Sequence, residues 1–235
     1  ASATSIGEKA AERTISRLDA EKLKTRQAPV LFCADMARSI ISHFTAAIGG
    51  SAQYRKASFL LDAAGTRVFP EFIQLQENPF EPRALGSANF DGEGVSLRAA
   101  PLVADGVVQN YLLDSYSARK LNLSTTGHAS GVHNLSLKDT GKSFEECIAS
   151  MHSGLLVTEL MGHGVNTVTG DYSRGAAGFW VENGKISHAV EEVTIASNLS
   201  DMFMRIVEIG NDVDLRGNIR CGSILLENMT IAGSD

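Results

Sequence analysis

The apolar residues near the start of the chain recur at helical spacing. From Thr4 to Leu23, the residues Ala11, Ile15 and Leu18 fall on one face, and charged residues fill the other. This pattern predicts an amphipathic helix that buries one side. The apolar run from Val30 to Cys33 that follows predicts a short buried strand.

A second helical pattern carries a wider apolar stripe. Asp35 is a suitable N-cap, and Gly49-Gly50 is a suitable end for the helix between them. Five large apolar side chains share one face of this helix: Met36, Ile40, Ile41, Phe44 and Ile48. Because full burial of each such side chain stabilises a fold by about 1.5–3 kcal/mol, we expect this helix to lie in the core.

From Phe59 onward the pattern changes to short apolar runs separated by turn residues. Two dipeptides, Asp105-Gly106 and Asn183-Gly184, are typical of tight hairpins and indicate antiparallel pairing. Strands are predicted at Phe69 to Gln76, Ser96 to Val103, Val107 to Leu113, Val132 to Leu137, Leu155 to Met161, Phe179 to Glu182, Lys185 to Val193, Cys221 to Leu226 and Met229 to Ala232.

Single helices are predicted between these strands. Ser115 to Leu121 is one, and Ser143 with Glu146 forms a capping box that opens another. A third starts at Asn198 or Ser200 and carries a group of apolar residues, Met202, Phe203, Ile206 and Val207. The predicted fold class is α+β, a mostly antiparallel sheet with hairpins and a few single packed helices, in one domain over residues 1–235.

The composition is ordinary for a globular protein, with 43% hydrophobic and 20% charged residues. The net charge of −6, and the acidic residues between the basic ones from Arg13 to Arg26, argue against nucleic-acid binding. The sequence has no apolar run of transmembrane length, so no membrane partner is expected. Cys33, Cys147 and Cys221 lie far apart, which favours a reducing compartment and a cytoplasmic location.

The histidines form no recognisable zinc motif. A zinc peptidase helix needs two imidazoles on one side and a Glu that polarises the bound water, but no histidine here is followed by Glu. His43, beside Phe44 on the apolar helix, is interpreted as a structural or surface residue. Four others lack a carboxylate at a supporting spacing, so no metal site is predicted among His128, His133, His152 and His163.

The segment from Gly162 to Gly178 is dense in Gly, Ser and Thr. Small residues leave backbone amides and carbonyls accessible, which suits the docking of an extended peptide by strand addition. The alternative is a tightly turned strand pair whose glycines meet backbone demands. The candidate peptide-binding residues are Gly162, His163, Gly164, Asn166, Thr169, Gly170, Asp171, Tyr172, Ser173, Arg174 and Gly175.

The stretch from Leu160 to Ile186, which contains this segment, closely resembles the TldD/PmbA peptidase family, and specifically its PmbA (TldE) branch. Further matching pieces are Tyr54 to Leu60, Ser115 to Leu121, Gly210-Asn211-Asp212, Cys221-Gly222-Ser223 and Ile231-Ala232-Gly233. The likeness covers nearly the whole chain from Ile6 onward. It corresponds to the C-terminal half of a family chain, so the resemblance implies that the N-terminal half is absent here.

The resemblance implies a two-subunit cytosolic peptidase that cleaves flexible or unfolded peptides. In this family the TldD-like subunit carries His-Glu-x-x-x-His on a helix and a Cys ligand near its C-terminus. Placing that helix on this sequence puts Ser42, His43 and Ala47 at the three positions, or His43, Phe44 and Ile48 after a shift by one residue, and Cys221 at the Cys ligand. Either register loses at least two of the three essential groups. Because catalytic zinc needs three protein ligands, the resemblance implies no catalytic residue and no metal in this chain.

The sequence therefore predicts a non-catalytic subunit of a heterodimer that docks the peptide substrate and stabilises a TldD-like metallopeptidase partner, which would hold the zinc. A homodimer in isolation is an alternative assembly. Two other functions stay open. One is an autonomous metallopeptidase with ligands among His43, His128, His163 and Cys221, and the other is an interaction protein that modulates DNA gyrase.

Overall fold

A computed structural model gives the fold and describes residues 2–233. The helices are α1 (Ala3–Ile15), α2 (Ala34–Ala47), α3 (Gly50–Tyr54), α4 (Ser115–Lys120), α5 (Phe144–Met151) and α6 (Leu199–Met204). The strands are β1 (Arg26–Phe32), β2 (Leu75–Glu77), β3 (Ala100–Ala104), β4 (Val107–Val108), β5 (Leu135–Leu137), β6 (Gly154–Met161), β7 (Asp171–Glu182), β8 (Lys185–Asn198), β9 (Ile206–Ile209), β10 (Ile219–Arg220) and β11 (Ile224–Ala232). None of the described helices is long and apolar enough to span a lipid bilayer.

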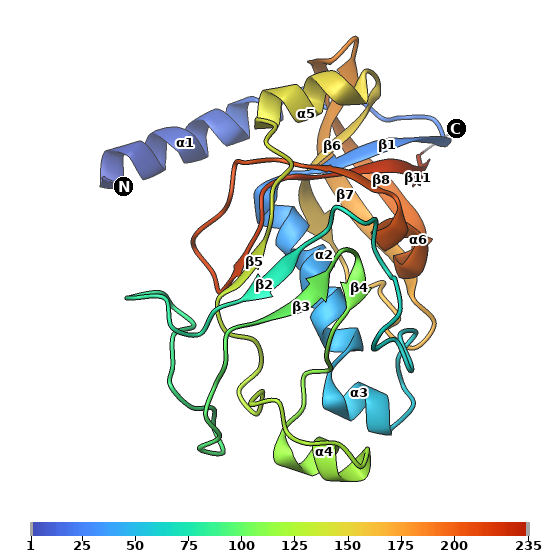
Figure 1. The fold of residues 1–235 in the computed structure, drawn as a ribbon. Coiled ribbons are helices and arrows are strands. Elements are labelled where there is room, and N and C mark those ends of the chain that lie inside the picture. Colours follow the sequence, from blue (N-terminus) through green and yellow to red (C-terminus); the bar gives the residue numbers. More distant parts are fainter. Residues whose placement is uncertain (1, 234–235) are drawn as a thin grey trace.

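The larger sheet closes on itself. Its strand order is β1-β6-β7-β8-β11-β9, and β1 also pairs with β11. All of its ladders are antiparallel except the one between β1 and β6. Strand β11 pairs with β1 along one edge and with β9 and then β8 along the other, which gives a barrel-like sheet with β9 as an added strand (Figure 1).

The smaller sheet has the order β10-β5-β2-β3-β4 and is antiparallel except between β10 and β5. The chain reverses between β3 and β4 at Asp105 and Gly106, whose φ angles are 50° and 74°. Asn183 and Gly184 have similar angles, 51° and 71°, between β7 and β8. Both hairpins confirm their predictions, because such turns need two residues that tolerate a positive φ. The α+β class with mainly antiparallel pairing is also confirmed.

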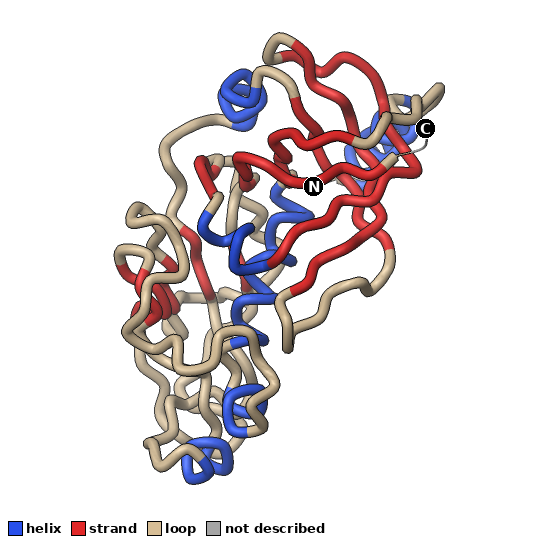
Figure 2. Tube along the Cα trace, turned by 90° about the vertical axis from the view of Figure 1, so that its right-hand side faces the viewer, coloured by secondary structure: helices blue, strands red, loops and turns tan. Residues whose placement is uncertain are grey.

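Helix α2 runs between the two sheets (Figures 1 and 2). One hydrophobic cluster joins its inner face to residues of both sheets and of α6. Phe44 is fully buried there, and its ring centroid lies 5.1 Å from that of Phe69 and 6.0 Å from that of Phe203, in edge-on arrangements. The prediction that α2 is a core helix is confirmed. Cys33 rather than Asp35 occupies its N-cap position, with no side-chain capping bond.

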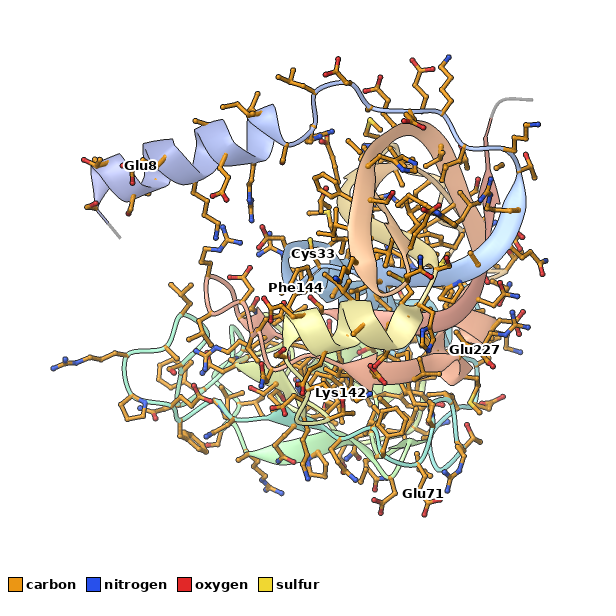
Figure 3. The ribbon with its side chains drawn as sticks, turned by 90° about the horizontal axis from the view of Figure 1, so that it is seen from above. Glu8, Cys33, Glu71, Lys142, Phe144 and Glu227 are labelled. Carbon is orange, nitrogen blue, oxygen red and sulfur yellow. The ribbon has the colours of Figure 1, made fainter. Side chains whose placement is uncertain are left out.

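Helix α5 covers the outer face of the barrel-like sheet. Its capping box is confirmed, since Ser143 and Glu146 each accept a hydrogen bond from the other's backbone amide. A second apolar cluster lies beneath it: Leu31, Cys147, Ile148, Met151, Leu156, Val181 and Leu225. Phe144 and Cys33, labelled in Figure 3, are partly buried and pack against this cluster.

Helix α1 projects away from the rest of the molecule (Figure 1). It ends at Ile15, earlier than predicted, and none of its residues is buried. The apolar face expected to pack is open, with Ile15 65% and Leu18 63% exposed. Within residues 2–233, therefore, no other part of the chain covers the apolar face of α1.

Several other predicted boundaries are wrong, and for three of them the pairing of the chain shows the reason. Only Leu75–Glu77 pairs as a strand within the predicted Phe69 to Gln76, because the residues before it wrap the β3–β4 turn and bond to Gly106. Ile206 begins β9 and does not continue α6. The two strands predicted at the end of the chain are one strand, β11, which stays paired with β1 throughout.

Candidate functional site

The segment from Gly162 to Gly175 comprises the link between β6 and β7, which ends at Gly170, and the first residues of β7; it continues the ladder between the two strands. The Ser173 amide donates to the Gly164 carbonyl at 2.7 Å, and the Asn166 amide donates to the Asp171 carbonyl at 2.8 Å. Val165 and Tyr172 form the bridge between these bonds. The chain between β6 and β7 is thus an extended, paired hairpin end and not an irregular loop.

Some predicted peptide-binding residues hold the turn itself. The Asn166 Oδ1 atom accepts from the amides of Val168 at 2.9 Å and Thr169 at 3.4 Å. The Thr169 hydroxyl donates to the Asp171 carboxylate at 2.6 Å. Asn, Asp and Thr side chains bond to nearby backbone in this way in many turns. The side-chain bonds of Asn166, Thr169 and Asp171 are therefore local.

The remaining predicted residues differ in exposure. Gly170 and Tyr172 are buried, while Arg174 and Gly175 are half-buried. The exposed members of the predicted set are Gly162, His163, Gly164, Asn166, Thr169, Asp171 and Ser173. A Cβ at Gly164 would overlap the Ser173 carbonyl oxygen, so a side chain at this position would push the two strands apart. Close backbone approach, rather than a positive φ, requires glycine here.

A polar group lies where β7 faces α2. The rings of His43 and Tyr172 lie 6.1 Å apart, edge to face. Burial, and secondarily the charge of Arg174, lowers the pKa of His43. Burial raises the pKa of Tyr172 to about 12, against the opposing effect of Arg174. Among the described residues, His43 Nε2, the Tyr172 hydroxyl and Arg174 Nε have no hydrogen-bond partner. This group, His43, Tyr172 and Arg174, is called the α2–β7 group below.

Part of the β6 edge is open. Strand β1 pairs with β6 only at Leu155, Leu156 and Val157, and the chain then leaves the sheet to form α2. From Thr158 to Met161, the edge of β6 that faces away from β7 has no strand partner in the described part of the chain. Helix α2 packs beside β6, so this open edge lies close to the helix that carries His43.

The family's zinc ligands have no counterpart around α2. Ser42 is exposed, Ala47 is buried and offers no donor, and His43 is the one histidine on this helix. Cys221 is fully buried, and burial, with Asp212 and Asp214 nearby, raises the pKa of its thiol to about 12. A catalytic zinc needs three protein ligands, and a cysteine can serve as one of them only as the deprotonated thiolate. These residues do not fit that ion.

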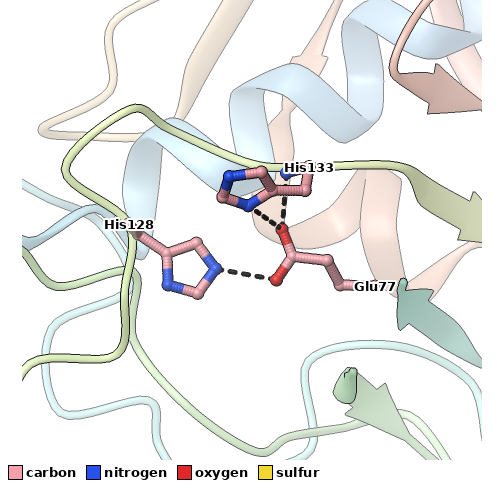
Figure 4. A group of neighbouring side chains, drawn as sticks. All are labelled: Glu77, His128 and His133. Atoms are coloured by element: carbon pink, nitrogen blue, oxygen red, sulfur yellow. Dashed lines mark hydrogen bonds and ion pairs between the residues drawn. The ribbon is translucent and has the colours of Figure 1, made fainter. Parts of the chain in front are cut away.

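A different group brings three potential ligands together. Glu77 ends β2, His128 lies in the loop after α4, and His133 lies just before β5 (Figure 4). His128 Nε2 is 2.8 Å from Glu77 Oε2, and His133 Nδ1 is 3.4 Å from Glu77 Oε1. The His133 amide also donates to Glu77 Oε1 at 2.6 Å. All three side chains are at most 8% exposed. This group, Glu77, His128 and His133, is called the Glu77 group below.

The Glu77 group is held by further hydrogen bonds. His128 Nδ1 lies 2.8 Å from the Thr126 hydroxyl, which accepts from the Leu113 amide at 2.7 Å. Burial alone would raise the pKa of Glu77, but the hydrogen bond and charge of His128, together with His133, outweigh it and lower that pKa. A carboxylate is therefore kept ionised in a buried place.

A pocket of about 300 Å³ adjoins the Glu77 group. Its wall includes His128, Gly131 and Val132 from the loop, and Thr45 and Ala46 from α2. Reasoning from the sequence noted the two histidines but missed Glu77, which precedes His128 by 51 positions. Only the pairing of β2 with β5 brings the carboxylate to the loop. The predicted ligand set of His43, His128, His163 and Cys221 is not assembled, since the Glu77 group is the one three-ligand cluster in residues 2–233.

Comparison with known proteins places the chain in a family. The sequence model of the PmbA/TldA metallopeptidase C-terminal domain matches residues 25–233. The metalloprotease PmbA of Escherichia coli O157:H7 is 50% identical over 97% of this chain and 51% of its own length. The chain thus spans about half the length of the curated relatives it matches.

Solved structures support the same assignment. A Bacteroides thetaiotaomicron protein, described as a proposed modulator of DNA gyrase, is 30% identical with a TM-score of 0.93, over 97% of this chain and 52% of that one. TldE from Thermococcus kodakarensis, at 24% identity, shares the fold with a TM-score of 0.85, over 98% and 55% of the two chains. The chain belongs to the PmbA/TldA metallopeptidase family and contains its C-terminal domain.

Proposed function

We propose that this chain belongs to the non-catalytic subunit of a cytoplasmic TldD/TldE-type metallopeptidase complex, where it docks flexible peptides and stabilises the TldD-like partner. The observation that supports docking is the open edge of β6 from Thr158 to Met161, continued by exposed Gly162, His163 and Gly164. An extended peptide can add to such an edge through main-chain hydrogen bonds, which bind many sequences with little regard to side chains.

The α2–β7 group supplies a second element of this docking site. Arg174 is half-buried and carries the positive charge of the α2–β7 group, so its guanidinium can bind a peptide carbonyl or carboxylate. Tyr172 is 1% exposed and contributes by packing against His43 rather than by touching a peptide. Asn166, Thr169 and Asp171 would shape the turn that carries the open edge.

The catalytic zinc would come from the TldD-like partner. In this chain, α2 offers one histidine, His43, and Cys221 is buried in surroundings that raise the pKa of its thiol. A zinc ion supplied by the partner would activate water for peptide hydrolysis. The residues of this chain would then hold the substrate in an extended form and leave the hydrolytic step to the other subunit.

Peptidase assays test this division of labour. The intact protein, its TldD-like partner and their mixture are compared on an unstructured fluorogenic peptide. Full turnover is expected from the mixture alone. Turnover by the intact protein alone would contradict the proposal, and equal turnover by the partner alone would remove the subunit role.

Arg174→Ala tests the docking site within the assembled complex. The loss of a charged hydrogen bond of about 1.5–3 kcal/mol is expected to raise the apparent KM tenfold or more. Arg98→Ala, at an exposed arginine outside the site, is the matched control and should change nothing. Size-exclusion chromatography and melting curves check that both variants assemble and fold. Unchanged kinetics for Arg174→Ala would remove this residue from the site.

Modified peptides test strand addition directly. N-methylation at alternate residues removes amide donors from one edge of an extended peptide, and methylation at the intervening residues removes them from the other. One series is expected to lose binding and the other to keep it. Equal binding of both series would show that the open β6 edge is not used.

A further inference from the structure

We propose that Glu77, His128 and His133 bind one divalent transition-metal ion such as zinc. The ligand atoms of these three side chains all lie within 4.8 Å of one another. Two imidazoles and one carboxylate form a recurrent ligand set for zinc and for iron(II). This site is separate from α2 and independent of the proposed docking role.

Two of the separations between ligand atoms, each from an imidazole nitrogen to a Glu77 oxygen, are near those around a bound ion. Zinc lies about 2.0–2.2 Å from imidazole nitrogen and carboxylate oxygen, so tetrahedral ligands are about 3.3 Å apart. His133 Nδ1 and Glu77 Oε1 are 3.4 Å apart, and His128 Nε2 and Glu77 Oε2 are 2.8 Å apart. Figure 4 shows both imidazoles with a nitrogen directed at the two carboxylate oxygens. To hold one ion, the ligand atoms, which now lie within 4.8 Å of one another, would have to approach to about 3.3 Å.

The surroundings of His128 favour a metal-binding tautomer. The Thr126 hydroxyl has one proton, and the Tyr111 carbonyl lies 3.0 Å from its oxygen. When that proton is donated to Tyr111, the Thr126 oxygen accepts from His128 Nδ1–H. His128 Nε2 then directs a lone pair at the Glu77 carboxylate, and a cation, either a proton or a metal ion, must lie between them. Metal-bound histidines are commonly oriented by such a second hydrogen bond.

At His128 the site adjoins a pocket that could admit a further ligand. His128 lines the pocket of about 300 Å³, together with Gly131 and Val132. Three protein ligands and one position open to water form the arrangement of reactive zinc sites, while a closed site would have four. The metal would also join β2 to the loop before β5, because its ligands come from both.

The sequence predicts no metal in this chain, so the proposal departs from that expectation. The competing explanation is a purely hydrogen-bonded group, in which a proton on His128 neutralises Glu77. The two differ in one property. A metal site gains stability when the ion is added to the protein, whereas a proton-filled group does not.

Metal titration of the intact protein distinguishes them. The protein is stripped with a chelator, and Zn²⁺ or Co²⁺ is then added and followed by elemental analysis, melting temperature and visible absorption. We expect one ion per chain, a raised melting temperature and the absorption bands of cobalt bound by nitrogen and oxygen. Absence of binding to the wild-type protein at micromolar metal would overturn the proposal.

Variants locate the ion. His128→Gln should abolish binding, and Thr126→Val should weaken it about 10–100-fold by freeing the imidazole. Thr125→Val is the matched control, because its hydroxyl bonds to the Leu113 carbonyl and not to His128. His43→Leu should retain the metal, which separates this site from α2. Undiminished metal binding by His128→Gln would place the ion elsewhere. If His128→Gln fails to fold, the loss of metal affinity in Thr126→Val is the deciding result.

Discussion

His43 and His128 both lie beside α2, but their surroundings differ. His43 is on the helix, its Nε2 has no hydrogen-bond partner in the described residues, and burial lowers its pKa. His128 lines the pocket against the same helix, and both of its ring nitrogens have partners, Thr126 and Glu77. One imidazole has a buried nitrogen without a partner, and the other is held in a complete network.

The difference indicates two kinds of site. A buried polar atom without a partner weakens the fold, so its retention in the α2–β7 group is consistent with a ligand that comes from outside. A buried carboxylate with two imidazoles is preorganised by the protein itself, and the proposed metal ion would take the place of the proton between His128 and Glu77. The same helix therefore separates an incomplete polar group from a complete one.

The largest expected effect tests whether α2 is a rigid wall between these groups. Phe44→Ala removes a fully buried ring packed on Phe69 and Phe203 and should lower the free energy of unfolding by about 3–5 kcal/mol. Urea unfolding measures this. Ser42→Ala, on the exposed face of the same helix, is the control and should stay within about 0.5 kcal/mol of wild type. A small loss for Phe44→Ala would mean that α2 is loosely packed.

A smaller loss is expected at the complete group. His128→Leu in metal-free protein leaves the Glu77 carboxylate and the Thr126 hydroxyl short of a partner and should cost about 1–3 kcal/mol. Urea unfolding in the presence of chelator checks the value. Stability equal to wild type would show that the network around Glu77 contributes little.

A pH effect is expected at the incomplete group. The pKa of His43 in the folded protein is lowered from its ordinary 6.5, chiefly by burial and then by Arg174, with Tyr172 facing the ring. Below pH 6.5 the unfolded chain binds the proton more readily, so the His43 contribution to stability falls as the pH falls towards the folded pKa. Unfolding at pH 7.5 and 5.5 should differ less in His43→Leu than in wild type. The same change in unfolding free energy between the two pH values in both proteins would show that His43 is not its source.

The smallest effect is expected from His43→Leu at neutral pH. Leu has similar bulk and no polar atom to leave unpaired, so the free energy of unfolding should stay within about 1 kcal/mol of wild type, or rise. The difference between the free energies of unfolding of His43→Leu and His128→Leu, measured under identical conditions, gives the contribution of the complete network around His128. A loss as large as that of His128→Leu would mean that His43 has a partner after all.

Local sequence was sufficient for the elements whose geometry depends on a few adjacent residues. Asp105-Gly106 and Asn183-Gly184 tolerate the positive φ angles of tight hairpins, and both hairpins form. Ser143 and Glu146 can satisfy each other's amides, and α5 begins where they predict. The apolar stripe of α2 identified its buried face because helical spacing places those residues together.

Tertiary structure decided what depends on distant partners. Tyr172 was expected at a peptide site, but packing against α2 buries its ring, and only the barrel-like sheet sets that neighbour. Leu75–Glu77 became a strand because β3 and β5 flank it, and this pairing alone brings Glu77 to His128 and His133. By itself, the sequence determined the family, the fold class and the segments that turn or cap. Which polar side chains meet in the interior was set by strand pairing between distant segments, because such contacts follow no local spacing.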